Sequence, residues 1–475
     1  MIKTFLKRFS VLLVPVLWSL FLSTAFAQNA VDIPGTPSPL LVVGLARVKS
    51  IALSCKWSLR VVGAAESSVL PPNTTVVLRG SGGQLSWEVS GAGGIVPVTE
   101  SGPVQITVAD PQSDAFILVA REENASPSLA GTGYTGRLVV MPDKHDLVVA
   151  NVVDIEDYVK SVVSWEMSDS WPLESLKAQA VAARSYAANK CCFQKTPGFG
   201  LRDYGEPGSL TPDSIQLWAN DQIYKGVLVQ NPNAVRATEA TRGEILTYGG
   251  TPIAAYFHAS AEGMTEDACH VWGGSIPYLR AVEEVAYKSP YSQWGAEFDM
   301  ETLSARLGDL GVTGPIDSIC GTEPGPSGRW YGVSVRTPSG TSWLKGTLTR
   351  GALGTQVRSL LFSSFIVGKG QMTTGCLNPS LEVTCLAGRG SVVLTPRETV
   401  ILGGGNATCV TGNRGLHVVS GLADSGPSRT VLTGKGWGHG VGLSQWGARA
   451  MALGGSPFSE ILAVYYPDTV LDVWW

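Results

Sequence analysis

The stretch VSWEMSDSWPLESLKAQAVAARSYA (residues 163–187) contains the strongest helical pattern of the sequence. Ser170-Trp171-Pro172 offers a capping hydroxyl and a first-turn proline, and the acid Glu174 follows where the helix dipole favours it. Beyond it, apolar side chains recur every three or four residues, at Leu173, Leu176, Ala180, Ala183 and Ala187. The pattern predicts a core helix from Pro172 onward, and its small side chains allow a neighbouring element to approach closely.

Glu166 is the unusual acid just ahead of this helix. It lies between Trp165 and Met167, and two valines precede it at 162 and 163. A carboxylate among apolar neighbours loses hydration, which raises its pKa and suits it to general acid catalysis, as for the acid of lysozyme. A helix-end or ion-paired glutamate fits the same pattern. Glu166 is therefore a candidate catalytic acid with a structural alternative.

Strand signals dominate the regions around this stretch. From Leu40 to about Val140, apolar or alternating runs are separated by Gly, Ser, Pro or Asn. Similar signals fill residues 222–256, where Gly249-Gly250 predicts a hairpin turn, and the Gly-, Thr- and Ser-rich segment 368–434. A short helix is expected near residues 301–307. We therefore predict an α+β protein dominated by strands.

The N-terminus predicts export. Lys3, Lys7 and Arg8 precede an apolar run at 11–22, and Ala25-Phe26-Ala27 forms a small-x-small cleavage site. Residues 1–27 are therefore expected to be a signal peptide, and the mature protein is expected in the periplasm, the cell wall or the extracellular space. No later segment has about 18 uninterrupted apolar residues, so no membrane span is expected after cleavage.

Composition excludes two further classes. The chain has 475 residues with 44% hydrophobic content and a formal net charge of −4, which allows a buried core and argues against disorder. Lys and Arg do not cluster, so no basic surface for nucleic acid is predicted. Among the 8 cysteines, Cys376, Cys385 and Cys409 share one Gly-rich segment, where a local disulfide is plausible, although sequence does not fix the pairing.

Several sequence blocks resemble one family. They are residues 151–158, 163–187, 234–243, 257–260, 271–279 and the closing GWGHGVGLSQWGA at 436–448. In this order they closely resemble the stage II sporulation protein D family, which also contains the amidase enhancers. The resemblance extends from about Gly136 to Pro467 and poorly covers residues 40–129 and 368–434.

The resemblance implies a peptidoglycan lytic transglycosylase with Glu166 as the catalytic residue. Such an enzyme cleaves the bond between N-acetylmuramic acid and N-acetylglucosamine and forms a 1,6-anhydro ring, so it needs no second carboxylate to activate water. The rival hypothesis is a non-catalytic module that binds glycan strands and stimulates a separate cell-wall amidase, because resemblance alone does not separate the two. A weaker alternative assigns the principal binding role to residues 40–140.

Other residues in the matching blocks are candidates for substrate binding. Trp165 and Trp171 flank Glu166 and can pack on sugar rings or in the core. Arg184 and Tyr186 follow the family pattern, with helix packing as the alternative. In the terminal block, backbone glycines allow close approach, and His439, Ser444 and Gln445 can orient sugar hydroxyls or N-acetyl groups, or the loop can be purely structural.

No cofactor is expected, with zinc as the alternative because some relatives bind it near this loop. The candidate ligands are His258, Cys269 and His270, which supply three of the four ligands that tetrahedral zinc takes. The family's small Ser/Gly run after the histidine is replaced here by Ala259-Ser260-Ala261-Glu262-Gly263, which argues against an inherited site.

The predicted organisation has six segments. They are a signal peptide (1–27), a leader (28–39), a β-rich module (40–130), the first part of the family domain (131–367), a β-rich cysteine-containing insertion (368–433) and the C-terminal block of the family domain (434–475).

Overall fold

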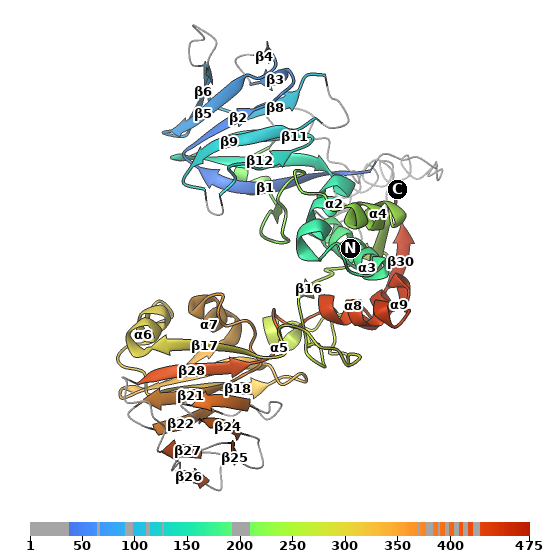
Figure 1. Ribbon diagram of the computed structural model, residues 1–475. Coiled ribbons are helices and arrows are strands. Elements are labelled where there is room, and N and C mark those ends of the chain that lie inside the picture. Colours follow the sequence, from blue (N-terminus) through green and yellow to red (C-terminus); the bar gives the residue numbers. More distant parts are fainter. Residues whose placement is uncertain are drawn as a thin grey trace, which may run out of the picture.

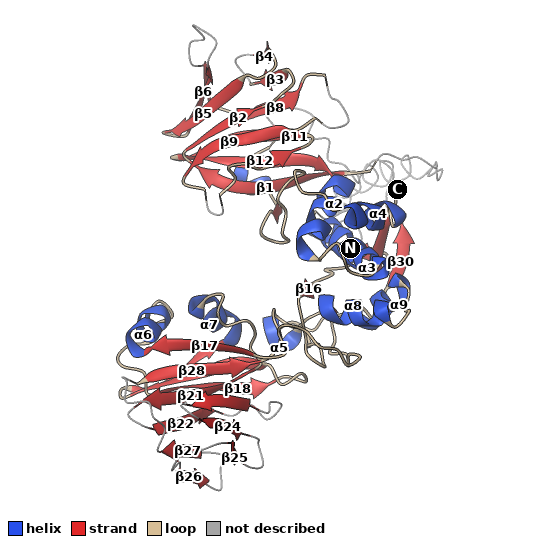
Figure 2. Cartoon of the chain, viewed as in Figure 1, coloured by secondary structure: helices blue, strands red, loops and turns tan. Residues whose placement is uncertain are grey.

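The computed structural model describes residues 38–63, 67–90, 98–110, 115–125, 128–191, 210–368 and 428–475, and the backbone of short strands between 371 and 420. The predicted signal peptide and most of the leader lie outside these residues. Figure 1 shows two β lobes joined by a helical region, and Figure 2 shows that strands predominate over helices. The predicted strand-dominated α+β class is confirmed. Within the described residues, none of the helices has the length and apolar character needed to span a membrane.

The N-terminal lobe consists of two sheets. The first has the strand order β13 (Leu217–Trp218), β1 (Leu40–Val48), β12 (Asp146–Asp154), β11 (Arg137–Asp143), β8 (Val104–Val108), β3 (Leu59–Val62) and β4 (Ser67–Leu70). The second has the order β10 (Gly133–Tyr134), β9 (Ile117–Glu123), β2 (Ser50–Ser54), β5 (Thr75–Ser81), β6 (Gln84–Ser90) and β7 (Val98–Glu100). One core cluster contains buried residues from both sheets, such as Val43, Val140 and Leu78.

The long antiparallel pair of β1 and β12 connects this lobe to the helices. Leu40 pairs with Asp154, and the register continues to Val48 and Leu147. Both strands are buried along most of their length, as the near-continuous apolar runs require. Asp154 then ends β12 and caps the next helix, so the strand fixes where that helix begins.

The helical region contains α2 (Ile155–Glu166), α3 (Leu173–Lys190), α4 (Pro232–Ala240), α8 (Gln445–Leu453) and α9 (Phe458–Tyr465). Two small sheets join chain segments far apart in sequence. One has the order β15 (Thr251–Pro252), β14 (Glu244–Tyr248) and β30 (Val470–Val473), and the other pairs β16 (Phe257–His258) with β29 (Leu443–Ser444) in parallel. The chain's last strand therefore closes the same region that α2 and α3 open.

The helix α3 confirms the prediction from its periodicity. Leu176, Ala180, Ala183 and Ala187 are fully buried in the main core, and Ala178, Val181 and Ala182 are buried in a second cluster on the opposite side. Small side chains on both sides let α2, α4, α8 and α9 pack closely around it. This helix is therefore the central element of the helical region.

Among its described residues the second lobe contains three sheets, and two of them share a core. One has the order β17 (Trp294–Asp299), β28 (Arg429–Gly434), β21 (Phe362–Gly368), β22 (Gln371–Cys376), β27 (His417–Ser420) and β26 (Thr408–Thr411), and the other β18 (Ser318–Pro324), β19 (Trp330–Thr337) and β20 (Gly340–Lys345). The helices α6 (Met300–Gly308) and α7 (Gly346–Leu353) complete its core, and α5 (Cys269–Trp272) precedes it. The strands β23 (Val383–Ala387), β24 (Gly390–Leu394) and β25 (Thr399–Leu402) form a third small sheet.

Two of the sheets contain strands from both sides of a predicted segment boundary. The strands β11 and β12 lie beyond residue 130 but belong to the N-terminal sheet, because they supply its central buried ladder. The strands β22, β26 and β27 of the predicted insertion extend a sheet that β17 and β21 begin, so the second lobe starts near Trp294. The helix α4 lies inside the segment with predicted strands, while the Gly249-Gly250 turn and α6 match their predictions. The side chains of Cys376, Cys385 and Cys409 lie outside the described residues.

Candidate functional site

Glu166 is the last residue of α2. The Asp154 side chain accepts a hydrogen bond from the Glu156 amide at 2.8 Å and so caps the start of this helix. Tyr158, Val159, Val162 and Val163 are fully buried on its inner side. The helix is therefore fixed at its start and along one side, and this places the Glu166 carboxyl in a defined position.

The Glu166 carboxyl group is held by two hydrogen-bond donors. Its Oε1 accepts from the backbone amide of Ile223 at 3.0 Å, and its Oε2 accepts from Nε2 of Gln445 at 3.0 Å. In the described part of the chain, no cation lies within ion-pair distance of it, so Glu166 lies at a helix end without an ion pair. Desolvation by burial raises the pKa of Glu166, and the two hydrogen bonds oppose this shift.

Gln445 lies 279 residues from Glu166 and is held by its own helix. It is the first residue of α8, whose N-cap is Ser444. Its Nε2 also lies 3.5 Å from Oε1 of Gln179, a fully buried α3 residue. The Gln179 Nε2 atom is buried and has no hydrogen-bond partner among the described residues. Three separate chain segments therefore meet at the carboxyl group.

A group of rings surrounds His439 on the glycine-rich loop. The His439 ring lies 5.2 Å from Trp272, 5.5 Å from His258 and 6.0 Å from Tyr256, between ring centroids. Tyr186 of α3 makes an edge contact with Tyr256 at 5.5 Å. Tyr256 and His439 are half-buried and Trp272 is 38% exposed, so this group presents partly exposed rings.

Burial keeps His439 neutral. Desolvation, with the nearby positive charges of Arg350 and Arg329, lowers its pKa to about 3. Its Nδ1 accepts a hydrogen bond from the Val441 amide at 3.0 Å, which leaves the other ring nitrogen as the protonated one. With Nδ1 already accepting, the other ring nitrogen of His439 can only donate a hydrogen bond, and the ring carries no positive charge near neutral pH.

The two tryptophans beside Glu166 have different surroundings. Trp165 is 39% exposed, and the Lys225 ammonium lies 4.0 Å from the centre of its ring. Trp171 is half-buried and makes an edge contact with Trp446 at 4.9 Å. Both rings retain exposed surface.

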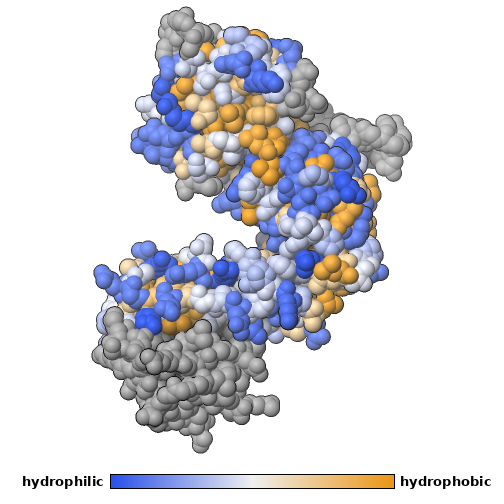
Figure 3. Space-filling view, in the orientation of Figure 1, coloured by the Kyte–Doolittle hydropathy of each residue, from blue (hydrophilic) through white to orange (hydrophobic). Residues whose placement is uncertain are grey.

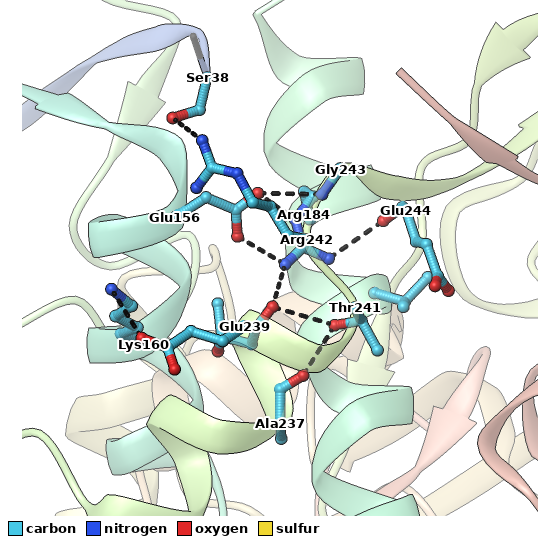
Figure 4. Close-up of polar contacts among 12 residues, drawn as sticks. Ser38, Glu156, Lys160, Arg184, Ala237, Glu239, Thr241, Arg242, Gly243 and Glu244 are labelled. Atoms are coloured by element: carbon cyan, nitrogen blue, oxygen red, sulfur yellow. Dashed lines mark hydrogen bonds and ion pairs between the residues drawn. The ribbon is translucent and has the colours of Figure 1, made fainter. Parts of the chain in front are cut away.

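Arg184 and Ser444 lie in the interior, as the structural alternatives expect. Arg184 is fully buried and forms a two-point ion pair with Glu156, at 3.1 and 2.7 Å (Figure 4). It also donates to the backbone carbonyls of Glu244 and Thr238. Ser444 Oγ is buried and accepts from the Gly447 amide as the cap of α8. Each holds an element in place.

Two acids near Glu166 in sequence are already engaged. Oδ1 of Asp169 accepts from the Asn233 and Ala234 amides at the start of α4. Glu174 pairs with Lys177 at 2.8 Å and accepts from the Phe458 amide. Neither is available as a second catalytic carboxylate.

The potential metal ligands regroup in the structure. Cys269 and His270 lie together with Asp267, with all three ligand atoms within 4.8 Å of one another, whereas His258 is buried against Val441 and His439. Within the described residues this group supplies three ligands, one fewer than a closed tetrahedral zinc site. These residues do not complete the zinc site considered from sequence.

Some site features carry no sequence signal. The Ile223 amide is a backbone group and could belong to any residue type, and Tyr256 lies in a segment with only strand signals. Gln179 interrupts the alanine-rich stretch of α3, and this polar residue in a core helix is the one available clue.

The fold and site define a strand-rich protein with a desolvated carboxyl group at the end of one helix, held by a distant C-terminal loop. Residues 143–248 match the family model described as Stage II sporulation protein (SpoIID). These findings, with the relatives described next, confirm the predicted resemblance to the stage II sporulation protein D and amidase enhancer family.

Three relatives illustrate the similarity. An uncharacterized protein of Brachyspira hyodysenteriae is 28% identical over 340 residues, which cover 71% of this chain and 72% of the relative. The amidase enhancer of Bacillus subtilis is 30% identical over 316 residues, which cover 66% of this chain and only 40% of that longer protein. Stage II sporulation protein D of Bacillus subtilis is 27% identical over 328 residues, which cover 67% and 75%.

Proposed function

We propose that this protein is an exported lytic transglycosylase that cleaves peptidoglycan glycan strands in cell-wall remodelling, with Glu166 as its acid and base. The supporting observation is the Glu166 carboxyl group, desolvated, without an ion-pair partner in the described chain, and held by the Ile223 amide and Gln445. A carboxyl group with a raised pKa retains its proton closer to neutral pH, as a general acid must.

The reaction requires one carboxyl group in two states. Protonated Glu166 donates its proton to the oxygen that bridges C1 of N-acetylmuramic acid and C4 of N-acetylglucosamine, and the C1–O bond breaks. The resulting carboxylate then takes the proton of the muramic C6 hydroxyl, whose oxygen bonds to C1 and closes the 1,6-anhydro ring. Glu166 ends protonated again, and no water is consumed.

The two hydrogen bonds to Glu166 suit this cycle. Donation from Ile223 and Gln445 stabilises the carboxylate formed after the first proton transfer, while burial favours the protonated state before it. The opposing effects keep both states accessible. Glu166 also needs no acidic partner, which agrees with the engagement of Asp169 and Glu174 elsewhere.

The test is digestion of purified peptidoglycan with the full-length protein, followed by mass spectrometry of 1,6-anhydro products. We expect release by the wild type, loss of release in Glu166→Gln and retention in Glu174→Gln, a matched control whose carboxylate pairs with Lys177. Equal release by the wild type and Glu166→Gln would remove Glu166 from the mechanism.

The name of one relative, amidase enhancer, favours a second candidate function. In that role the same surface binds glycan strands and stimulates a separate cell-wall amidase without cleaving the strand. Incubation of peptidoglycan with and without an added amidase separates the two functions. Anhydro products without amidase support the enzyme, whereas faster amidase action without anhydro products supports the enhancer.

A further inference from the structure

Four aromatic rings follow one another next to the Glu166 site, and two guanidinium groups lie across them. We call this the aromatic strip, and it consists of Trp171, Trp446, Tyr291, Trp437, Arg449 and Arg358. Successive ring centroids are separated by 4.9 Å (Trp171 to Trp446), 6.4 Å (Trp446 to Tyr291) and 4.7 Å (Tyr291 to Trp437). The contacts are continuous although they join four separate chain segments.

The arginines of the strip are stacked and lack acidic partners. The Arg449 guanidinium lies 5.6 Å from the Trp171 ring and 5.1 Å from the Trp446 ring, and that of Arg358 lies 5.4 Å from Tyr291 and 4.9 Å from Trp437. Among the described residues, neither has a carboxylate within ion-pair distance, and the buried Nε of Arg449 has no hydrogen-bond partner. The strip therefore carries two uncompensated positive charges.

The four rings are only partly buried. Trp437 is 38% exposed, and Trp171, Trp446 and Tyr291 are half-buried. Each ring packs through an edge against its neighbour, with interplanar angles of 67° to 87°. A guanidinium lies over each ring, and the surface of the rings that stays exposed lies beside it. Partly exposed amphipathic rings are typical of surfaces that bind ligands.

The chain connects the strip to the proposed reaction centre. Trp446 directly follows Gln445, the residue that donates to Glu166, and Trp171 lies in the short loop between α2 and α3. From there the strip passes to Tyr291, just before β17, and to Trp437 on the glycine-rich loop. A glycan strand that has one sugar at Glu166 and continues toward Trp446 lies along these rings.

We propose that the aromatic strip binds a peptide-free part of the glycan strand on one side of Glu166. Sugar rings lie against the exposed parts of the aromatic rings, and the lactyl carboxylates of muramic acid, which are free only where no peptide is attached, pair with Arg449 and Arg358. The inference rests on the proposed function, since it concerns the same substrate. An apolar protein partner is not expected on the strip, because it would bury two guanidinium groups without an opposite charge, which costs free energy. Since both guanidiniums lie close to the rings, the matching carboxylate must be attached close to the stacked sugar, as the lactyl group is.

The test measures binding of the full-length Glu166→Gln protein to two probes of equal length. One is a neutral β-1,4-linked N-acetylglucosamine hexamer, and the other a peptide-free peptidoglycan hexamer, which differs by its lactyl groups. We expect the protein to bind the acidic probe more tightly than the neutral one. The double variant Arg358→Gln/Arg449→Gln should lose about tenfold in affinity for the acidic probe and keep its affinity for the neutral one. Trp437→Ala should lower the affinity for both probes by about three- to tenfold.

The control is Arg60→Gln/Arg121→Gln, which removes the same charge from exposed positions of the N-terminal lobe and should change neither affinity. Rising salt concentration should reduce the preference for the acidic probe when both arginines are present. This measurement requires no substitution in the strip. Equal affinity for the two probes, or a preference that survives in the arginine variant, would overturn the proposal. Because binding is measured without Glu166, failure of cleavage by the wild type is a separate result that bears only on the proposed function.

Discussion

Replacement of Arg184 distinguishes a structural role from a role in glycan contact. Its guanidinium is 0% exposed and donates to both oxygens of Glu156, which is itself buried. Glu156 also accepts from the Gly243 amide at 3.2 Å (Figure 4) and, outside that view, from Nε1 of Trp475 at 2.9 Å. The pair therefore joins α2, α3, the start of β14 and the C-terminus. Removal of one partner leaves the other charge buried without compensation, which costs about 3 to 5 kcal/mol.

We therefore expect Arg184→Met to lower the free energy of unfolding by about 3 to 5 kcal/mol, as measured by urea denaturation. The double variant Glu156→Gln/Arg184→Met should recover part of this loss, because it leaves no unpaired charge. Arg242→Met is the matched control, an exposed arginine of the same cluster, with an expected change within about 0.5 kcal/mol. An Arg184→Met protein with wild-type stability and no cleavage of peptidoglycan would refute the structural role.

Three further predictions concern the site itself. Glu166→Gln should raise the melting temperature at pH 7 but not near pH 4. A carboxyl group whose pKa is raised in the folded state stabilises the fold below its unfolded-state pKa of about 4.3, and this stabilisation is lost as the pH rises through the folded-state pKa. An unchanged melting temperature at pH 7 would contradict the desolvation of the Glu166 carboxyl group. Gln445→Leu removes a donor that lowers the Glu166 pKa, so the alkaline limb of the pH–rate profile should move to higher pH, and an unmoved limb counts against the contact. Gly438→Ala should destabilise the protein more than Gly249→Ala in thermal unfolding. Both have positive φ, but a Cβ at Gly438 would lie 2.6 Å from His258 Cβ, while Gly249 has open space, and equal losses would show that the loop adapts.

The sequence predicts the elements whose signals are local. Helix α3 has its proline, its first-turn acid and its alanine stripe within one short stretch, and the Gly249-Gly250 turn requires only two residues with positive φ. Glu166 is identifiable because its immediate neighbours are apolar. Its position and donors agree with that reading, although its role in catalysis remains a prediction.

Other elements depend on contacts between distant segments. Helix α2 contains Val159, Val162 and Val163, whose branched side chains favour strands, and it is stabilised by burial against the sheets and α3. The pair of β14 and β30 joins residues 244–248 to the last strand of the chain. No local sequence pattern predicts the helix α2 or the pairing of β14 with β30. None predicts the contact of the Ile223 amide with Glu166 either.

The second lobe participates in the site, although much of it lies in the poorly matching part of the sequence. Arg329, between β18 and β19, is almost fully buried and donates to the carbonyls of Ala261 at 2.9 Å and Met264 at 3.3 Å. Its side chain also packs against Gly440, where an added Cβ would lie 2.6 Å from Nε, so only a glycine fits. One arginine of this lobe therefore fixes both the segment after His258 and the loop that carries His439. Because that loop leads directly into Gln445, the position of the Glu166 donor depends on the lobe, and the lobe is an integral part of the site.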